Sequence, residues 1–547
     1  MERTRPWVAR LRERRAEQWV AAILLLLGWY KITYSLAKNT FSIDGGYYTT
    51  IALFVRDGLG LKTNVSLYHQ AYSYFPHETS VSPLWPLLYG YVSKIFPLYS
   101  VAIWLPTLLY FTALIAGYLW GSRLLPRDLF PRSLPGFNAG HIVMLIFGLH
   151  EGFFIATSTP YTEGLSYTLL FLALWRFHAC LREMTPVRAL EVGVWLGVLL
   201  LARAQLALVA IAVVLALGFR LVTRPSRQSA IAMVVTPAVF LAIVGSYYFF
   251  FLRDFVGNDA VAAIMRFDQG WETDVLSKFA PMKETDGLAH YVEDRFGGVK
   301  IAFKEEGRYA YARVFYLFQW AIPAAFLALI AHALRDLRVA STRRAVTWLR
   351  SDEAAPWVFA VLLGLGGWTS MHLIHKDYFS EWHFARRQGL TAGLGFFLAL
   401  AYLLHRPRLA RAVGVFILCG SVYLGWNAAL EPAREAAAKS KPYDPEDRHT
   451  ALVKWLKQED ERREGGLVVA LSAQEPQQIG YLTPEVGYHW VYKRTTLEDI
   501  DTLTQELGVD YVIFRNPRSW RFSRDPQFAK RYALVKRASG FMIYAPR

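Results

Sequence analysis

Long apolar runs recur along the first 430 residues of this 547-residue chain, and they constrain its fold more than any other feature. A helix needs about 20 mainly apolar residues to cross roughly 30 Å of hydrocarbon, and many of these runs are that long. The C-terminal part beyond them contains no such run. The sequence therefore predicts a mainly α polytopic membrane protein, with a transmembrane domain over 1–432 and a small α/β domain over 433–547.

We expect about eleven transmembrane helices. The least secure stretch is 187–221, which fits either one long helix or two helices broken near Arg203. A single helix there would reverse the side of the membrane for all that follows. The expected spans lie near 18–37, 99–121, 139–157, 161–181, 187–202, 203–221, 229–252, 313–334, 355–374, 387–405 and 409–428.

Basic residues give these spans an orientation. With eleven spans and a cytoplasmic N-terminus, the cytoplasmic segments contain 22 Lys and Arg against 8 Asp and Glu. The outer loops 38–98, 253–310 and 375–387 contain 15 Lys and Arg against 16 Asp and Glu. This is the asymmetry that the positive-inside rule predicts. The net charge of +16 thus orients the protein in its membrane, and it requires no nucleic-acid partner.

The first outer loop carries one carboxylate, Asp44, just beyond the first span. Two glycines follow it and allow a sharp turn, and apolar residues then recur at helical spacing. This pattern predicts an interfacial helix lying on the bilayer, and a second one is predicted after Pro83. Asp44 is either a cap of the first helix, since Asp is favoured at helix N-termini, or a functional carboxylate.

Charged residues within the expected spans are few, and five of them map to the outer half of the membrane, level with Asp44. An unpaired charge in hydrocarbon costs several kcal/mol, so each needs a partner or a function. Their convergence predicts a site, and structural ion pairs such as Glu163 with Arg203 are the alternative. Snorkelling explains Arg176 and Glu191 near the cytoplasmic ends. The five are Lys31, Glu151, Glu163, Arg203 and Arg313.

Further candidate residues lie in the outer loops. His77 and Glu78 precede the second interfacial helix, but their spacing matches no recognised metal motif. Arg386 and Arg387 lie outside against the charge rule, so they either hold an anion or are simply solvated at a loop end. The loop 253–310 is too long for a mere connector and is either a mobile lid or a small structured subdomain.

The C-terminal part alternates helix and strand patterns. Helices are expected at 448–463 and 497–507, and strands at 467–471, 511–514 and 541–544. This alternation predicts a small α/β layer. Because it contains no Gly-rich phosphate loop, we expect acceptor recognition or a structural cap.

Three stretches resemble motifs of the GT-C glycosyltransferases, multi-span enzymes that use polyprenyl-phosphate sugars as donors. Residues 43–48 look like their first-loop acidic motif, 159–166 are similar to the acidic stretch that opens span four, and 200–205 resemble the basic motif near a later helix break. The branch resembled includes protein mannosyltransferases, lipid A aminoarabinose transferases and core-sugar transferases of Gram-negative envelopes. Many members have a second acid beside the first-loop aspartate, and here Gly45 occupies that position.

The resemblance implies transfer of a sugar from a polyprenyl-phosphate donor to an acceptor hydroxyl outside the cytoplasm, with inversion. Asp44 would be the base and Glu163 would position a substrate. No cofactor is required with certainty, but a divalent metal, Mg or Mn, would have Asp44, Glu163 and His77 as candidate ligands. The candidate substrate-binding residues are Arg203, Arg386, Arg387, Arg313, Lys31, Tyr47, Tyr48 and His77.

The expected partners are the lipid-linked donor, a lipid, glycan or protein acceptor, and membrane lipids. The expected location is a bacterial inner membrane, with the site and the C-terminal domain facing the periplasm. A lipid or sugar transporter or flippase is the alternative, because it too would place charges inside the membrane, although closer to its midplane.

Overall fold

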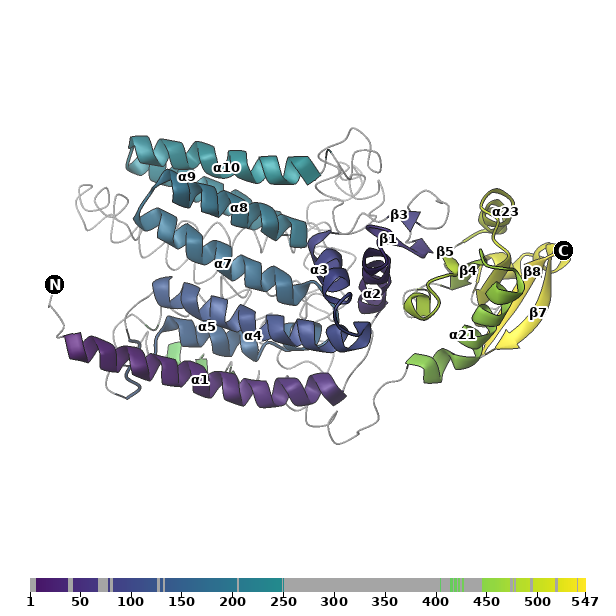
Figure 1. Ribbon diagram of the computed structural model, residues 1–547, viewed down its shortest axis with the longest axis horizontal. Coiled ribbons are helices and arrows are strands. Elements are labelled where there is room, and N and C mark those ends of the chain that lie inside the picture. The colour runs from purple at the N-terminus through teal and green to yellow at the C-terminus, as the bar shows by residue number, and fades with distance from the viewer. Residues whose placement is uncertain are drawn as a thin grey trace, which may run out of the picture.

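The computed structural model describes residues 6–37, 43–66, 77–78, 82–124, 128–130, 133–203, 206–247 and most of 445–547, with isolated residues between 249 and 426. A bundle of helices and a mixed sheet flanked by helices make up this part (Figure 1). Several predictions fall outside it: the spans at 313–334 and 355–374, the loop 253–310, and Arg313, Arg386 and Arg387.

The helices of the bundle run side by side (Figure 1). Within the described ranges, four segments are long and apolar enough to cross a membrane: Arg14–Leu36, Leu98–Leu124, Glu163–Arg182 and Arg227–Tyr247. The total of about eleven stays a prediction. The elements are α1 (Pro6–Ala37), α4 (Leu98–Leu124), α5 (Ala139–Gly148), α6 (Glu151–Ala156), α7 (Glu163–Arg182), α8 (Pro186–Ala202), α9 (Ala207–Thr223) and α10 (Arg227–Tyr247).

The uncertain stretch 187–221 forms two helices. Helix α8 ends at Ala202, Arg203 adopts an extended conformation (φ −162°, ψ 107°), and α9 starts at Ala207. The single-helix alternative is therefore wrong. Helix α8 packs closely on α10, because a Cβ at Gly193 would lie 2.7 Å from the carbonyl oxygen of Thr236. Small residues permit such close approach between membrane helices.

Helices α2 (Ile43–Arg56) and α3 (Leu84–Val92) lie between the bundle and the C-terminal sheet (Figure 1). Both expected helices are thus present, but α2 does not expose an apolar face to lipid, because residues 45–55 are all buried. It packs on α3 at Gly90, where a Cβ would lie 2.6 Å from the Val55 Cβ. The buried residues of α2 therefore contact protein, and an interfacial position of the helix stays a prediction.

The start of α2 also differs from the expectation. The helix begins at Ile43, so Asp44 lies in its first turn and Gly45 and Gly46 lie inside the helix rather than in a turn before it. Asp44 is therefore not the residue that precedes the helix. A carboxylate in the first turn is still favoured by the helix dipole.

The C-terminal part forms a mixed sheet with strand order β2-β5-β4-β6-β8-β7. Strands β2, β5, β4 and β6 run parallel, and β8 and β7 are antiparallel to their neighbours. Both expected helices and all three expected strands are present. The elements are α21 (Pro445–Arg462), β4 (Val468–Ser472), β5 (Gly487–Val491), α23 (Leu497–Glu506), β6 (Tyr511–Phe514), α24 (Phe528–Arg531), β7 (Tyr532–Ala538), β8 (Phe541–Pro546) and the 3₁₀ turns η5 (Gly480–Leu482) and η7 (Phe522–Arg524).

One strand of this sheet comes from the first loop. Strand β2 (Val65–Ser66) pairs with β5, and just before and after it β1 (Lys62–Thr63) pairs with β3 (His77–Glu78) in a separate two-stranded sheet. A continuous cluster of buried apolar side chains accordingly extends from the bundle through α2 to one face of the six-stranded sheet. The first loop and the C-terminal part are therefore packed as one unit.

Glu459 ties α21 to the sheet. Its carboxylate accepts hydrogen bonds from the Tyr511 hydroxyl at 2.6 Å and from the guanidinium groups of Arg462 and Arg463. The bond from Arg462 lowers the pKa of Glu459 to about 2, although burial opposes this shift. A pKa lowered by folding means that the charged form stabilises the fold above its ordinary pKa of 4.5, and that this stabilisation disappears as the pH falls towards about 2.

We expect Glu459→Gln to destabilise the C-terminal sheet by about 1–2 kcal/mol at pH 7, because four hydrogen bonds lose their charged acceptor. Hydrogen exchange of β4 and β6 amides in the full chain measures this as a ratio of variant to wild-type rates. That ratio should fall towards one as the pH is lowered below about 4.5. Exposed Glu461 on the same helix is the control, and equal effects of Glu459→Gln and Glu461→Gln would contradict the prediction.

Candidate functional site

A buried ion pair joins two helices at the end of the bundle where α2 and α3 lie. Arg203 Nη1 is 2.8 Å from Glu163 Oε1, Glu163 is fully buried and Arg203 is 6% exposed. Glu163 is the first residue of α7, and Arg203 follows the last residue of α8. An acid at a helix N-terminus and a base at a C-terminus each complement the helix dipole, so the pair is favoured at both ends. Two of the five charges predicted to lie at one level, Glu163 and Arg203, therefore form the ion pair that was the alternative to a functional site.

Lys31 of α1 lies in the same region and is fully buried. Its Nζ donates to Phe154 O at 2.5 Å, Thr157 Oγ1 at 2.8 Å and Ser158 Oγ at 2.5 Å. An ammonium group has three N–H donors, and all three have an acceptor here. Lys31 therefore binds the end of α6, and a role in holding a phosphate would require it to give up one of these bonds.

Thr157 connects Lys31 to the start of α7. Its Oγ1 accepts from Lys31, and its Cγ2 would lie 3.4 Å from a Cβ placed on Gly164, the neighbour of Glu163. The structure thus brings Lys31, Glu163 and Arg203 into one packed region. Thr157 and Ser158 were not predicted as partners, although their position in a polar Thr-Ser-Thr run between two apolar spans was a usable signal.

Helix α3 links this region to α2. Trp85 is fully buried, and its Nε1 donates to the carbonyl oxygen of Pro160 at 2.9 Å, three residues before Glu163. One turn further along α3, Tyr89 stacks on Trp85, and its hydroxyl lies 3.3 Å from Thr49 Oγ1 of α2. The helix that carries Asp44 is thus connected through α3 to the loop that leads into Glu163.

Among the remaining predicted residues, the structure describes the side chains of some and only the backbone of others. Tyr47 and Tyr48 are buried in α2, 3% and 6% exposed, so they contribute to its packing. The backbones of Asp44, His77 and Glu151 lie in α2, β3 and α6, and their side chains are outside the described structure.

Arg176 and Glu191 form an ion pair of 3.6 Å between α7 and α8, each about one-third exposed. Snorkelling alone therefore did not account for them. They pair because the two neighbouring helices bring their opposite charges within reach of each other.

No group of three or more His, Cys, Asp or Glu side chains able to hold a metal occurs among the described residues. Glu163 is a poor ligand in this arrangement, because a divalent cation bound to it would be repelled by the Arg203 guanidinium 2.8 Å away. The metal prediction thus retains only Asp44 and His77, whose side chains are not described.

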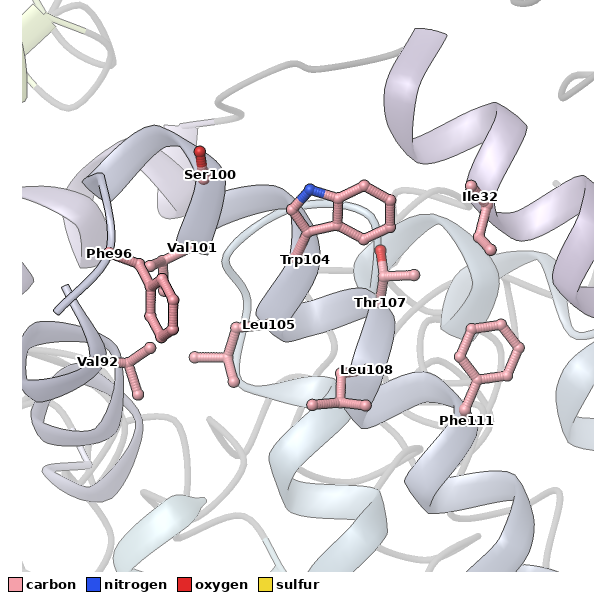
Figure 2. Close-up of a pocket in the computed structure, with 10 residues that line it drawn as sticks. All are labelled: Ile32, Val92, Phe96, Ser100, Val101, Trp104, Leu105, Thr107, Leu108 and Phe111. Atoms are coloured by element: carbon pink, nitrogen blue, oxygen red, sulfur yellow. The ribbon is translucent and has the colours of Figure 1, made fainter.

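Figure 2 shows a separate pocket of about 520 Å³ between α1, α3 and α4. The described residues of its lining include no charged side chain, and their apolar surface matches a hydrocarbon chain. It uses the Trp104, Leu108 and Phe111 side of α4, while Gly164 of α7 approaches α4 at Pro106 and Leu109. The pocket therefore lies apart from the ion pair. Its lining residues are Ile32, Val92, Phe96, Ser100, Val101, Trp104, Leu105, Thr107, Leu108 and Phe111.

Sequence comparisons found no matching protein family and no matching curated protein. Among the solved structures to which the chain is similar are the oligosaccharyltransferase AglB from Archaeoglobus fulgidus with an inhibitory peptide and a dolichol-phosphate, and ArnT from Cupriavidus metallidurans bound to undecaprenyl phosphate. The AglB match has a TM-score of 0.49 at 12% identity and covers 97% of this chain and 74% of AglB. The ArnT match has a TM-score of 0.42 at 12% identity and covers 96% of this chain and 98% of ArnT.

The AglB structure contains a dolichol-phosphate and the ArnT structure contains undecaprenyl phosphate. Because both TM-scores are below 0.5, function is inferred below from this chain's own residues.

We expect Glu163→Gln to lower the free energy of unfolding by about 3–5 kcal/mol, because it leaves the buried Arg203 charge uncompensated. The double variant Glu163→Gln/Arg203→Met should lose less than this single variant. Glu191→Gln is the matched control, since it breaks the partly exposed pair between the same two helices and should cost about 0–1 kcal/mol. Thermal unfolding of the full chain in detergent measures all three. Equal costs for Glu163→Gln and Glu191→Gln would contradict a buried pair.

We expect Lys31→Met to cost at least about 2 kcal/mol, because three hydrogen bonds from a charged donor are lost inside the protein. Lys94→Met is its control, since Lys94 is exposed and should change stability by no more than about 0.5 kcal/mol. The same unfolding measurement compares them. If Lys31→Met were as mild as its control, the three bonds would not be holding α1 to α6.

Proposed function

We propose that this chain is a glycosyltransferase that moves a sugar from a polyprenyl-phosphate donor to an acceptor hydroxyl. The observation that carries the proposal is the gathering of Lys31, Glu163 and Arg203, all buried, at the end of the bundle where α2 begins. Ionisable side chains inside a membrane bundle mark functional sites by default, because their burial is costly. The acidic first-loop motif 43–48 lies on α2, which packs at this same end.

Asp44 is the proposed general base. Its carboxylate takes the proton of the acceptor hydroxyl as the acceptor oxygen attacks C1 of the sugar from the face opposite the phosphate. The bond between C1 and the phosphate oxygen breaks, and its electron pair leaves with polyprenyl phosphate. The new glycosidic bond therefore has the inverted configuration. No step in this scheme runs through a metal.

Arg203 is the proposed cation at the leaving phosphate. A guanidinium has five N–H donors, so its bond to Glu163 is compatible with binding a second anion. Guanidinium groups suit phosphate oxygens because they bind two of them at once. Glu163 then orients Arg203 and, through it, the donor. Arg386, Arg387 and Arg313 remain proposed further cations at this phosphate.

The proposed reaction takes place on the side of the membrane opposite the N-terminus, and the bacterial periplasm is the proposed compartment. The distribution of Lys and Arg supports this orientation. The acceptor class, whether lipid, glycan or protein, is left to experiment.

The test is release of polyprenyl phosphate, measured by mass spectrometry, when purified full-length protein is given a panel of polyprenyl-phosphate sugars and candidate acceptors. Release from one donor by the wild type would establish the transferase and name the sugar. If no donor is consumed under conditions in which the protein is folded, the transporter alternative takes precedence.

In the same assay, Asp44→Asn should lower kcat by a factor of about one hundred to ten thousand, the usual cost of losing a general base. The matched control is Asp57→Asn just after the other end of α2, where the carboxylate is half-exposed and paired with Arg56. It should change kcat by less than about twofold. A near-normal kcat for Asp44→Asn would mean that Asp44 only stabilises the first turn of α2.

A further inference from the structure

The first loop is built into the C-terminal sheet. Strand β2 is the edge strand, with Val65 opposite Tyr488 and Ser66 opposite His489 in parallel register. The Tyr488 N–H donates to the carbonyl oxygen of Asn64 at 2.7 Å. More than 400 residues separate the two strands in sequence, so this contact joins distant parts of the chain.

The Asn64 side chain stabilises this pairing with two further hydrogen bonds. It is fully buried, and its Nδ2 donates to the carbonyl oxygens of Gly480 and Thr483, each at 2.9 Å. An aspartate at this position would place a carboxylate oxygen against two carbonyl oxygens in a buried site, which is strongly unfavourable. The sequence 64–66 also matches a glycosylation acceptor, but an amide buried in this way cannot receive a glycan in the folded protein.

The same turn touches the helix that carries Asp44. A Cβ placed on Gly480 would lie 2.9 Å from Val65 Cγ2 and 3.4 Å from Thr50 Oγ1 of α2. Gly480 therefore packs directly between β2 and α2, and no side chain fits there. Thr50 is six residues beyond Asp44, about 9 Å along the helix axis, so the turn η5 supports the middle of α2.

We propose that Asn64 is a positioning residue: by locking the turn 480–483 onto β2, it holds α2 and its Asp44 in place against the bundle. The C-terminal domain then acts on the reaction by fixing the helix that carries the base. The effect on catalysis rests on the proposed function of Asp44, whereas the effect on α2 does not.

Hydrogen exchange tests the structural half without any activity. Asn64→Asp should speed exchange of the amides in 43–56 by about tenfold or more, because two buried hydrogen bonds are replaced by repulsion. Asp501→Asn is the matched control: it weakens a contact with Tyr532 and Arg531 near the opposite edge of the same sheet. Unchanged exchange in 43–56 for Asn64→Asp, or an equal increase for Asp501→Asn, would overturn the proposal.

A disulfide between β2 and β5 distinguishes loss of this strand pairing from general unfolding of the Asn64→Asp variant. The substitutions Ser66→Cys and His489→Cys occupy register partners on β2 and β5. Combined with Asn64→Asp and Cys419→Ser, the cross-link formed under oxidation should restore slow exchange in 43–56, and a reductant should abolish the effect. Failure of the cross-linked protein to regain protection would mean that β2 does not hold α2, and the proposal would be wrong.

A double-mutant cycle measured by activity tests whether Asn64 affects catalysis through Asp44. Asn64→Asp should lower kcat by up to about a hundredfold in the wild-type background, the scale expected when a catalytic group is displaced by about 1 Å. In the Asp44→Asn background it should cause no further loss. Losses that multiply would assign Asn64 a merely structural role. If Asp44→Asn is fully active, the proposed role of Asp44 as the base fails, while the exchange result still decides whether Asn64 holds α2.

Discussion

The ion pair between Glu163 and Arg203 sets the arrangement of the bundle at its functional end. Neither charge is tolerable alone inside the protein, so the start of α7 and the end of α8 must lie at the same level. The break that separates α8 from α9 follows from this, because Arg203 leaves the helix at the point where it meets its partner. Lys31, a second buried cation, is stabilised by hydrogen bonds to oxygen atoms of α6 and of the residues after it instead of by an acid.

Around this pair, the protein has no sharp division between membrane bundle and C-terminal sheet. Helix α2 is buried along residues 45–55, with α3 on one side and the turn η5 of the sheet on another. The buried apolar cluster is continuous from the bundle through α2 to the sheet. A helix enclosed in this way has little freedom to move, which suits a proposed catalytic carboxylate that must be held precisely.

Local patterns predicted most of the described fold, and contacts between distant segments explain what they missed. Long apolar runs located most of the described bundle helices, although the expected span 139–157 forms two helices, α5 and α6. The charges Glu163 and Arg203 stood out because hydrocarbon makes them costly. Burial of α2 was not predictable, because part of its cover comes from residues near 480, which lie far away in the sequence. Strand β2 is two residues long and has no pattern of its own. The role of Lys31 was missed because its partners are a carbonyl and two hydroxyl groups instead of an acid.

The pairing of β2 with β5 also limits how the chain can thread the membrane. Strand β2 follows α1, which is long enough to cross a membrane, and α2, whose 14 residues are too few. In the proposed orientation α1 crosses the membrane, and β2 then lies on the face opposite the start of α1. Because two strands of one sheet cannot be separated by a bilayer, that orientation requires the C-terminal sheet to lie on the same face as β2. It therefore requires an odd number of crossings, and the predicted eleven meets this requirement.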